Sequence, residues 1–381
     1  MRAASRKLLV VVLGLLVLGF VLYRLSGSLH LAGFSGAKVL HAVRGANPYY
    51  LLLSLVAIYA CYALRSLRWK VFQKNLGASH FWRIYGSTVA GFAAIFLLGR
   101  AGEPVRPLLL ARKENLPVAD TFGIYVLERL FDMASTAVIA AIGLLLFQAQ
   151  SHTGETSRRL ETAARTTGAL LFAGLIGAVA MLVYLRLHGT ALLQRGLHRW
   201  LHATGWRATV ARIVLGFARG VQTIRTWTDL ALAIFYSGAH WFLVTMVYLW
   251  VSHSFAGTLQ NITLSDAMLV LAFTLVGSTV QLPGVGGGSQ AGSIIAYTAI
   301  YGVEREPAVA AAMVLWLITF AACSLAGVPI LIHEGWSLGD LKRMAKEEKK
   351  QEAAVLESEP IREIRDSKEV AGRSRRGDEI E

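Results

Sequence analysis

The amino-acid sequence predicts an all-α polytopic membrane protein with about six full transmembrane helices plus two opposed re-entrant hairpins in an inverted repeat. Three observations lead to this fold class. Apolar residues make up 55% of the 381 residues and charged residues only 16%, which is too little charge for a soluble chain of this length. Apolar runs of membrane-spanning length recur along the chain. Two of the apolar regions are broken by polar stretches rich in glycine and proline, at 98–107 and 282–290.

A spanning helix needs about 20 mostly apolar residues. The candidates for full spans are 8–23, 49–64, 121–147, 167–187, 230–251 and 307–333. We interpret 8–23 as an uncleaved first span, because the run is long for a signal peptide and the Ser-Gly-Ser that follows is a poor cleavage site. Two further apolar stretches, 84–98 and 266–282, run directly into the broken motifs. Together these segments form an integral membrane domain over 1–336.

Basic residues set the orientation in the membrane. The formal net charge is +14, but residues 337–381 hold 11 basic and 12 acidic residues, so 27 basic and 12 acidic residues give the membrane domain +15. An excess of Lys and Arg in short loops marks the cytoplasmic side. Three segments are strongly basic. The N-terminus holds Arg2, Arg6 and Lys7, and the loop after the second span holds Arg65, Arg68, Lys70, Lys74 and Arg83. The 188–228 connection holds six arginines and no acidic residue. We therefore expect a cell (inner) membrane protein with both termini in the cytoplasm.

The 188–228 connection has leucine and tryptophan at helical spacing, with arginine and histidine on other faces. This pattern suits an amphipathic helix in the interface of an anionic leaflet, and a simple positive-inside anchor explains the same charges. The charged tail at 337–381 is expected to be cytoplasmic and disordered or loosely helical. Because the basic residues flank apolar spans instead of forming a soluble patch, the sequence argues against nucleic-acid binding.

Each broken stretch is predicted to form a re-entrant hairpin, because two full crossings would put the basic loops on the wrong side. A hairpin near 84–112 then opens to the cytoplasm, and one near 266–301 opens to the outside. The order span, hairpin, span therefore repeats with opposite orientation. In such inverted repeats the substrate site is expected near the membrane midplane.

The first broken stretch carries charged residues at membrane depth. Its glycines allow tight turns, and Pro104 suits the first position of a new half-helix. The free N–H groups of that half-helix form a site for an anion such as phosphate. Glu103 is favourable at this terminus, whereas Arg106 needs a negative partner: Glu103, another buried carboxylate or a ligand phosphate. Arg100 poses the same question, and a closed set of internal ion pairs is the alternative to ligand binding.

The next span carries Glu128, Arg129 and Asp132. The four-residue spacing puts the two carboxylates on one helical face, with Arg129 about 100° round the helix. Ionisable groups inside a membrane normally face the bundle interior and pair with one another or mark a pathway. Pairing of the carboxylates with Arg100 and Arg106 is favoured over a proton relay.

The second broken stretch has a permissive backbone, in which Pro283 and Gly284 precede three consecutive glycines that begin at Gly286. Ser289, next to Gln290, is expected to cap the half-helix that follows. The stretch is interpreted as a flexible gate, with a helix break that permits close packing as the alternative. The candidate substrate-binding residues are therefore Arg100, Glu103, Arg106, Glu128, Arg129, Asp132, Pro283, Gly284, Gly286, Ser289 and Gln290.

No catalytic residue, metal ion or cofactor is predicted. Cys61 and Cys323 lie in apolar runs without a metal-binding spacing, and we interpret them as small buried hydrophobes. His240 and His253 flank an aromatic-rich span and are interpreted as interface and packing residues. The glycine-rich stretch is neither a P-loop nor a dinucleotide-binding motif, and the sequence has no HExxH motif.

Taken in this order, the motifs resemble a known family, the flippase-like membrane domain named after lysylphosphatidylglycerol synthases. The resemblance covers about residues 5–335 and rests on Gly-Arg-Ala-Gly-Glu at 99–103 with Arg106-Pro107, on Glu128-Arg129 with Asp132, and on Leu282-Pro283-Gly284. It implies lipid translocation. Aminoacyl transfer in that family belongs to a separate cytosolic domain, and only a charge-rich, low-complexity tail of about 45 residues follows the last span here, so a synthase is not implied. Where the family's second motif usually continues with arginine and glutamate, this chain has Ser289 and Gln290.

These observations predict a non-enzymatic transporter or flippase for an anionic membrane lipid or a polyprenyl-phosphate-linked lipid, working by alternating access at the two hairpins. Arg100, Arg106 and the half-helix N-terminus would hold the head group. One alternative is an accessory membrane protein that partners a lipid-modifying enzyme. The other is a lipid-linked glycosyltransferase, for which the sequence offers neither a carboxylate-bound metal nor a soluble catalytic loop.

Overall fold

The computed structural model of the chain describes residues 36–77, 79–147, 155–188, 226–282 and 286–333. Several expectations from the sequence lie outside these residues. They are the first span at 8–23, nearly all of the 188–228 connection, the tail at 337–381, and the positions of Pro283 and Gly284. The side chain of Arg100 is likewise outside the described part.

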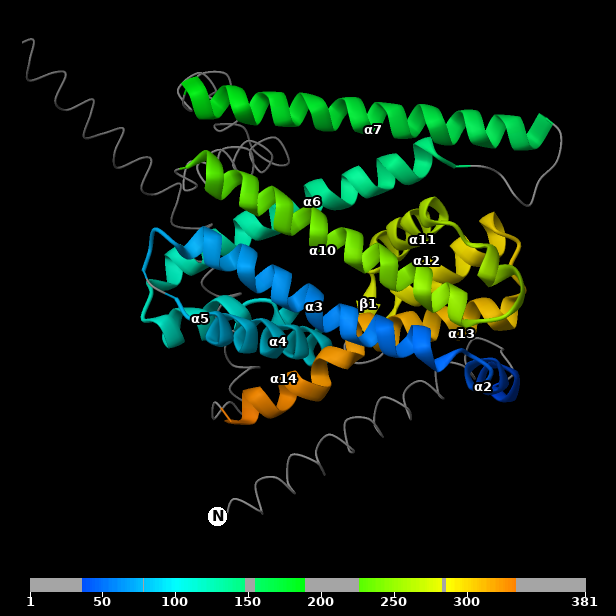
Figure 1. The fold of residues 1–381 in the computed structure, drawn as a ribbon, viewed down its shortest axis with the longest axis horizontal. Coiled ribbons are helices and arrows are strands. Elements are labelled where there is room, and N and C mark those ends of the chain that lie inside the picture. The colour runs from blue at the N-terminus through cyan, green and yellow to red at the C-terminus, as the bar shows by residue number, and fades with distance from the viewer. Residues whose placement is uncertain (1–35, 78, 148–154, 189–225, 283–285, 334–381) are drawn as a thin grey trace, which may run out of the picture.

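The described residues are almost entirely helical (Figure 1). In chain order the elements are α2 Gly36–Arg44, α3 Pro48–Gln73, α4 Phe81–Leu98, η1 Gly99–Gly102, α5 Val105–Glu114, α6 Val118–Leu145, α7 Glu155–His188, α10 Trp227–Ser254, η2 Gly257–Asn261, α11 Leu264–Gly277, β1 Gln281–Leu282, β2 Gly286–Gly287, α12 Gly288–Ile295, η3 Ala296–Ile300, α13 Arg305–Trp316, η4 Leu317–Ala321 and α14 Ala322–His333. The segments η3 and η4 are π-helical. Within the described part, the β-structure is the two-residue antiparallel pair β1–β2.

Four stretches in the described part are long and apolar enough to cross a membrane: α3, α4, α10 and the segment Arg305–His333, which contains α13, η4 and α14. Helices α6 and α7 have sufficient length, with 28 and 34 residues, and α6 carries ionisable residues within its apolar sequence. The predicted fold class, an all-α polytopic membrane protein, is confirmed. Helix α4, expected as one arm of a hairpin, has 18 residues and is itself of spanning length.

Helices α3 and α10 form an antiparallel pair at the centre of the fold (Figure 1). At one end, Asn47 N–H donates to the Ser254 carbonyl at 2.7 Å. At the other end, Lys74 Nζ lies 3.0 Å from Asp229 Oδ1. The start of each helix therefore meets the end of the other, as required of equivalent helices in two oppositely oriented halves.

Other helix contacts also occur in equivalent pairs in the two halves. Helix α4 packs on α3 and α14, while α11 packs on α10 and α6. Helix α5 contacts α4 and α6, and α12 contacts α11 and α13. Each of these contacts of the first half thus has a counterpart in the second, which supports the predicted inverted repeat.

The first hairpin consists of α4, η1 and α5, and its turn depends on glycine. Gly99 has φ 66°, a left-handed conformation that glycine adopts without steric strain. A side chain at Gly102 would collide with the backbone of Ala94 on α4. The turn therefore packs directly on α4, and α5 begins at Val105 with Pro104 as its N-cap, one position away from the expected start.

The second hairpin consists of α11, the β1–β2 pair and α12. Side chains at Gly277, Gly288 or Gly292 would collide with backbone atoms of the opposite arm, so the two arms are held at backbone distance. The expected N-cap, Ser289, is wrong, since Gly287 precedes the helix and its N–H donates to Gln290 Oε1 at 2.5 Å. The side-chain amide of Gln290, in the first turn of α12, therefore caps the helix instead of the Ser289 hydroxyl.

The contact between α14 and α4 allows a test of the fold. A Cβ atom at Gly327 would lie 2.5 Å from both the Ala93 Cβ atom and the Val89 carbonyl oxygen. We expect Gly327→Val to push the helices apart and destabilise the protein by about 1–3 kcal/mol or more. The midpoint of thermal unfolding in detergent should fall. Gly238→Ala is the control, because no atom lies within 4 Å of that position; equal midpoints for the two variants would contradict this packing.

Candidate functional site

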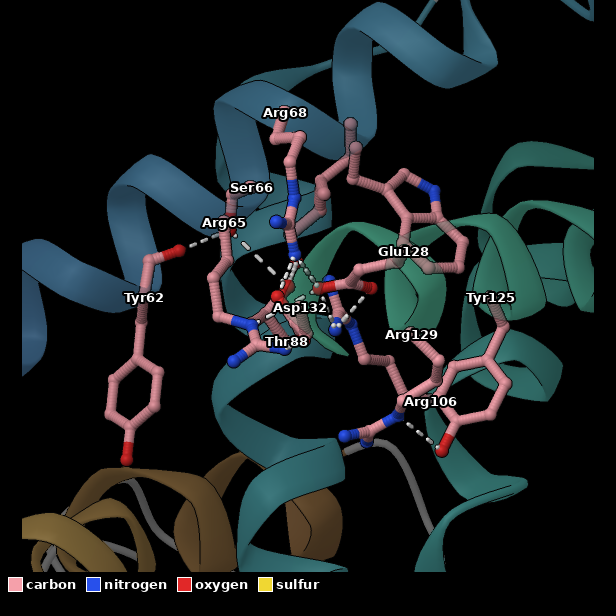
Figure 2. Close-up of polar contacts among 12 residues, drawn as sticks. Tyr62, Arg65, Ser66, Arg68, Thr88, Arg106, Tyr125, Glu128, Arg129 and Asp132 are labelled. Carbon is pink, nitrogen blue, oxygen red and sulfur yellow. Dashed lines mark hydrogen bonds and ion pairs between the residues drawn. The ribbon is translucent and has the colours of Figure 1, made fainter. Parts of the chain in front are cut away.

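Five charged side chains from three helices meet in the interior of the helix bundle (Figure 2). They are Arg65 and Arg68 of α3, Arg106 of α5, and Glu128 and Asp132 of α6, and we call them the central ion cluster. Every member is at most 6% exposed. At membrane depth such groups are tolerated only when they are paired.

Helical spacing places the members on facing surfaces. Arg65 and Arg68 are three residues apart on α3, and Glu128 and Asp132 are four apart on α6, so each pair lies on one face of its helix. Arg106 is the second residue of α5, directly after the break in the first hairpin. The two carboxylates share a face as predicted, and that face meets the arginines.

Glu128 is shared by all three arginines. Its Oε1 atom accepts from Arg65 Nε at 3.0 Å, from Arg68 Nη2 at 3.1 Å and from Arg106 Nη1 at 3.0 Å. Its Oε2 atom lies 2.8 Å from Arg106 Nη1. One carboxylate thus ties α3, α5 and α6 together.

Asp132 binds the two arginines of α3 and a residue of α10. Arg68 Nη2 donates to its Oδ1 atom at 2.7 Å, and Arg65 Nη2 donates to its Oδ2 atom. The indole N–H of Trp241 also donates to Oδ1, at 3.3 Å. On the same helix, Ser237 accepts a 2.8 Å hydrogen bond from Arg68 Nη1. Helix α10 therefore also contributes contacts to the cluster.

The central ion cluster is short of negative charge. Three guanidinium groups face two carboxylates, which leaves a net charge of +1. Several donors also lack an acceptor within the described part of the chain: Arg68 Nε, Arg106 Nε and Arg106 Nη2. A buried, unpaired charge is costly, and a buried donor without a partner costs about 1–3 kcal/mol. The geometry therefore suits an additional anion.

Aromatic rings cover the arginines. The Arg106 guanidinium lies 4.6 Å from the ring centroid of Trp69, and the Arg65 guanidinium lies 4.9 Å from that of Phe92. Cation–π contacts of this kind stabilise a desolvated charge by about 2 kcal/mol without neutralising it. Gly91 on α4 makes the approach possible, because a Cβ atom there would lie 2.5 Å from Arg106 Cβ.

A second polar group links the turn of the first hairpin to α6. The Tyr125 hydroxyl donates to Glu103 Oε2 at 2.5 Å and accepts from Arg129 Nε at 2.9 Å. Glu103 and Arg129 therefore belong to this group, which is centred on Tyr125, about one turn of α6 before Glu128. The sequence left Glu103, another buried carboxylate or a ligand phosphate as the partner of Arg106. In the structure the partner is the buried carboxylate of Glu128.

The second broken stretch is neutral where the first is charged. Ser289 Oγ donates to Gln290 Oε1 at 3.2 Å, and Ser293 Oγ lies 2.7 Å from Thr274 Oγ1 on the opposite arm. Gly286 pairs with Leu282 in the β1–β2 ladder. The contact of Ser293 with Thr274 and the pairing of Gly286 with Leu282 hold the two arms of the hairpin to each other. In the described residues, no group of three or more His, Cys, Asp or Glu side chains is placed to hold a metal ion.

Two arginines of this site contradict the expectations from the sequence. Arg65 and Arg68 were assigned to a cytoplasmic loop, but α3 continues to Gln73 and buries both. The apolar residues Trp69 and Phe72 beyond the arginines were the available signal, since they extend the helical pattern. His240, interpreted as an interface or packing residue, is buried with its Nε2 atom 3.2 Å from Arg65 Nη1.

Comparison with protein families identifies the family of the chain. The family described as lysylphosphatidylglycerol synthase TM region matches residues 9–327. The chain belongs to this family. A comparison with curated proteins finds no match. The family relates the chain to membrane proteins of lipid modification or transport, and the matched range includes both hairpins and the whole central ion cluster.

The charge balance of the cluster predicts which substitutions destabilise this family member. Glu128→Gln leaves three guanidinium groups with one carboxylate, so we expect a loss of about 3–5 kcal/mol and a lower midpoint of thermal unfolding in detergent. Asp120→Asn is the matched control, because Asp120 lies on the same helix and is exposed. A Glu128→Gln variant as stable as the control would show that the carboxylate does not hold the cluster together.

Proposed function

We propose that this chain is a transporter that moves an anionic lipid between the two leaflets of its membrane and binds the head group at the central ion cluster. The observation that carries the proposal is the excess of one positive charge among buried side chains, together with donors that have no acceptor in the described residues. An anionic head group supplies both the missing charge and the missing acceptors. The family, which is one of lipid modification or transport, supports a lipid as the bearer of that anion.

A purely structural role explains the cluster less well. Ion pairs that only hold helices together are most favourable when charges balance and every donor is satisfied. Here Arg106 uses Nη1 for Glu128 and leaves Nε and Nη2 buried without an acceptor in the described part. These two atoms form the edge of a guanidinium group that suits a phosphate in bidentate fashion.

The position of the cluster along the helices indicates the leaflet from which the head group enters. Arg68 lies five residues before the end of α3 at Gln73, a distance of about 7.5 Å along the helix. Lys70, Lys74 and Arg83 are exposed at that end and, by the distribution of basic loops, face the cytoplasm. Access from the cytoplasmic leaflet follows, with the cluster displaced from the midplane toward that side.

Movement of the first hairpin is the proposed route to alternating access. The cluster is closed, so a head group reaches it only if an enclosing element moves. The first hairpin is joined to α6 by the contacts of Arg106 with Glu128 and of Tyr125 with Glu103. In this proposal both hairpins are re-entrant, the first opens the cluster to the cytoplasmic side, and the neutral second hairpin serves as the opposite gate.

Arg106→Gln tests this function. The substitution leaves two guanidinium groups with two carboxylates, so the cluster is balanced and the protein should fold with an unchanged or higher midpoint of thermal unfolding. Transfer of fluorescent phosphatidylglycerol between the leaflets of reconstituted vesicles should slow by about 10- to 100-fold, the effect of losing charge-assisted hydrogen bonds. Lys70→Gln is the control, because it removes an exposed positive charge from the same helix as Arg65 and Arg68.

Other outcomes separate the competing functions. Equal transfer by Arg106→Gln and wild type would overturn the head-group role of the cluster. Lipid binding without transfer by wild type would favour an accessory subunit of a lipid-modifying system. Formation of a new lipid product from a sugar donor would favour a glycosyltransferase. Equal transfer of phosphatidylcholine and phosphatidylglycerol would show that the site does not select anionic lipids.

A further inference from the structure

His240 borders the central ion cluster without being an ion-pair partner in it. The residue lies on α10 and is 4% exposed. Its Nε2 atom is 3.2 Å from Arg65 Nη1. The charged groups that face the ring are Arg65 and Arg68 from α3, and Asp132 and Glu128 from α6.

The contact with Arg65 fixes the tautomer of the ring. A guanidinium group carries five N–H donors and no acceptor, so Nε2 must present its lone pair to Arg65. In a neutral imidazole the other nitrogen then carries the proton. His240 therefore presents a donor, Nδ1–H, on the edge of the ring directed away from Arg65.

This Nδ1–H group is buried and has no acceptor within the described part of the chain. Its neighbour Trp241 shows the contrast, because the indole N–H of Trp241 reaches Asp132 Oδ1 at 3.3 Å. Both oxygen atoms of Asp132 are occupied, by the two arginines of α3 and by this indole. The ring faces Arg68, whose Nε atom is likewise buried without an acceptor in the described part.

We infer that His240 is a ligand of the anionic head group and donates Nδ1–H to one of its oxygen atoms. The inference rests on the proposed function, since it requires an anion at the cluster. Because a neutral imidazole adds a donor without adding charge, the bound state keeps the balance between one excess positive charge and one negative charge. Arg65 holds the ring in the tautomer that makes this possible, and His240 in turn accepts one of the Arg65 donors.

Two isosteric substitutions separate this role from a merely structural one. His240→Asn puts an amide N–H near the position of Nδ1 and removes the acceptor for Arg65. His240→Gln puts an amide oxygen near the position of Nε2, keeps the contact with Arg65 and removes the donor. The two variants therefore test the two ring nitrogens one at a time.

The measurement is the dissociation constant of short-chain phosphatidylglycerol for the purified full chain in a non-ionic detergent, by titration calorimetry. We expect His240→Gln to weaken binding by about tenfold or more, as for loss of a hydrogen bond to a charged acceptor. His240→Asn should bind within about threefold of wild type, a difference below 1 kcal/mol. Thermal unfolding of each variant confirms that it is folded, and Lys70→Gln controls for the substitution itself.

The outcomes distinguish failure of the inference from failure of the proposed function. If His240→Gln binds like wild type while Arg106→Gln does not, His240 is not a head-group ligand and the cluster keeps its function. If His240→Asn loses binding and His240→Gln keeps it, the histidine acts only by positioning Arg65, which also overturns the inference. If wild type and Arg106→Gln bind the lipid equally well, the proposed function itself is wrong.

Discussion

The first half of the fold depends on the ion pairs of the Glu128 carboxylate with three arginines. The carboxylate accepts from arginines on α3 and α5 while it belongs to α6, so three separate segments converge on one buried group. Without these partners, α6 would place unpaired charges in the middle of a membrane-length helix. With them, the helix is compatible with a bilayer although its composition alone is too charged for a simple span. The first hairpin is anchored by the same contact through Arg106.

The two halves share packing and differ in chemistry. In each half a broken hairpin packs on a long helix of its own half and on a helix of the other. The second residue of the helix that follows the break is Arg106 in the first hairpin and Ser289 in the second. One hairpin is therefore fixed by charge to α6, and the other is held by hydroxyl contacts and by glycine-permitted backbone packing between its own arms. In the proposed function, the charged hairpin would belong to the binding position and the neutral hairpin would be the opposite gate.

The sequence predicted the helical class, both hairpins and the common face of Glu128 and Asp132, because each follows from local spacing or from hydropathy. It did not predict that Arg65, Arg68 and His240 join that face. Basic residues at the end of an apolar run look the same whether they lie in a cytoplasmic loop or in the last turns of a longer helix. The difference arises from tertiary contacts: acids on α6, some 60 residues away in sequence, offer the arginines a partner inside the bundle. A histidine on an aromatic helix carries no local signal of such a neighbour.

The composition of the cluster also bears on the proposed transport, in which the site would return empty after it releases a head group. Three arginines alone would bind an anionic head group strongly, but after release they would leave a charge of +3 inside the membrane domain, which is prohibitive. Glu128 and Asp132 act as permanent internal counter-ions and reduce the empty site to +1. A head group with one negative charge then brings the loaded site to zero. In the proposed transport cycle, the charge of the cluster would change by only one between the empty and the loaded state. The carboxylates would also compete with the head group for the arginines, which would favour its release.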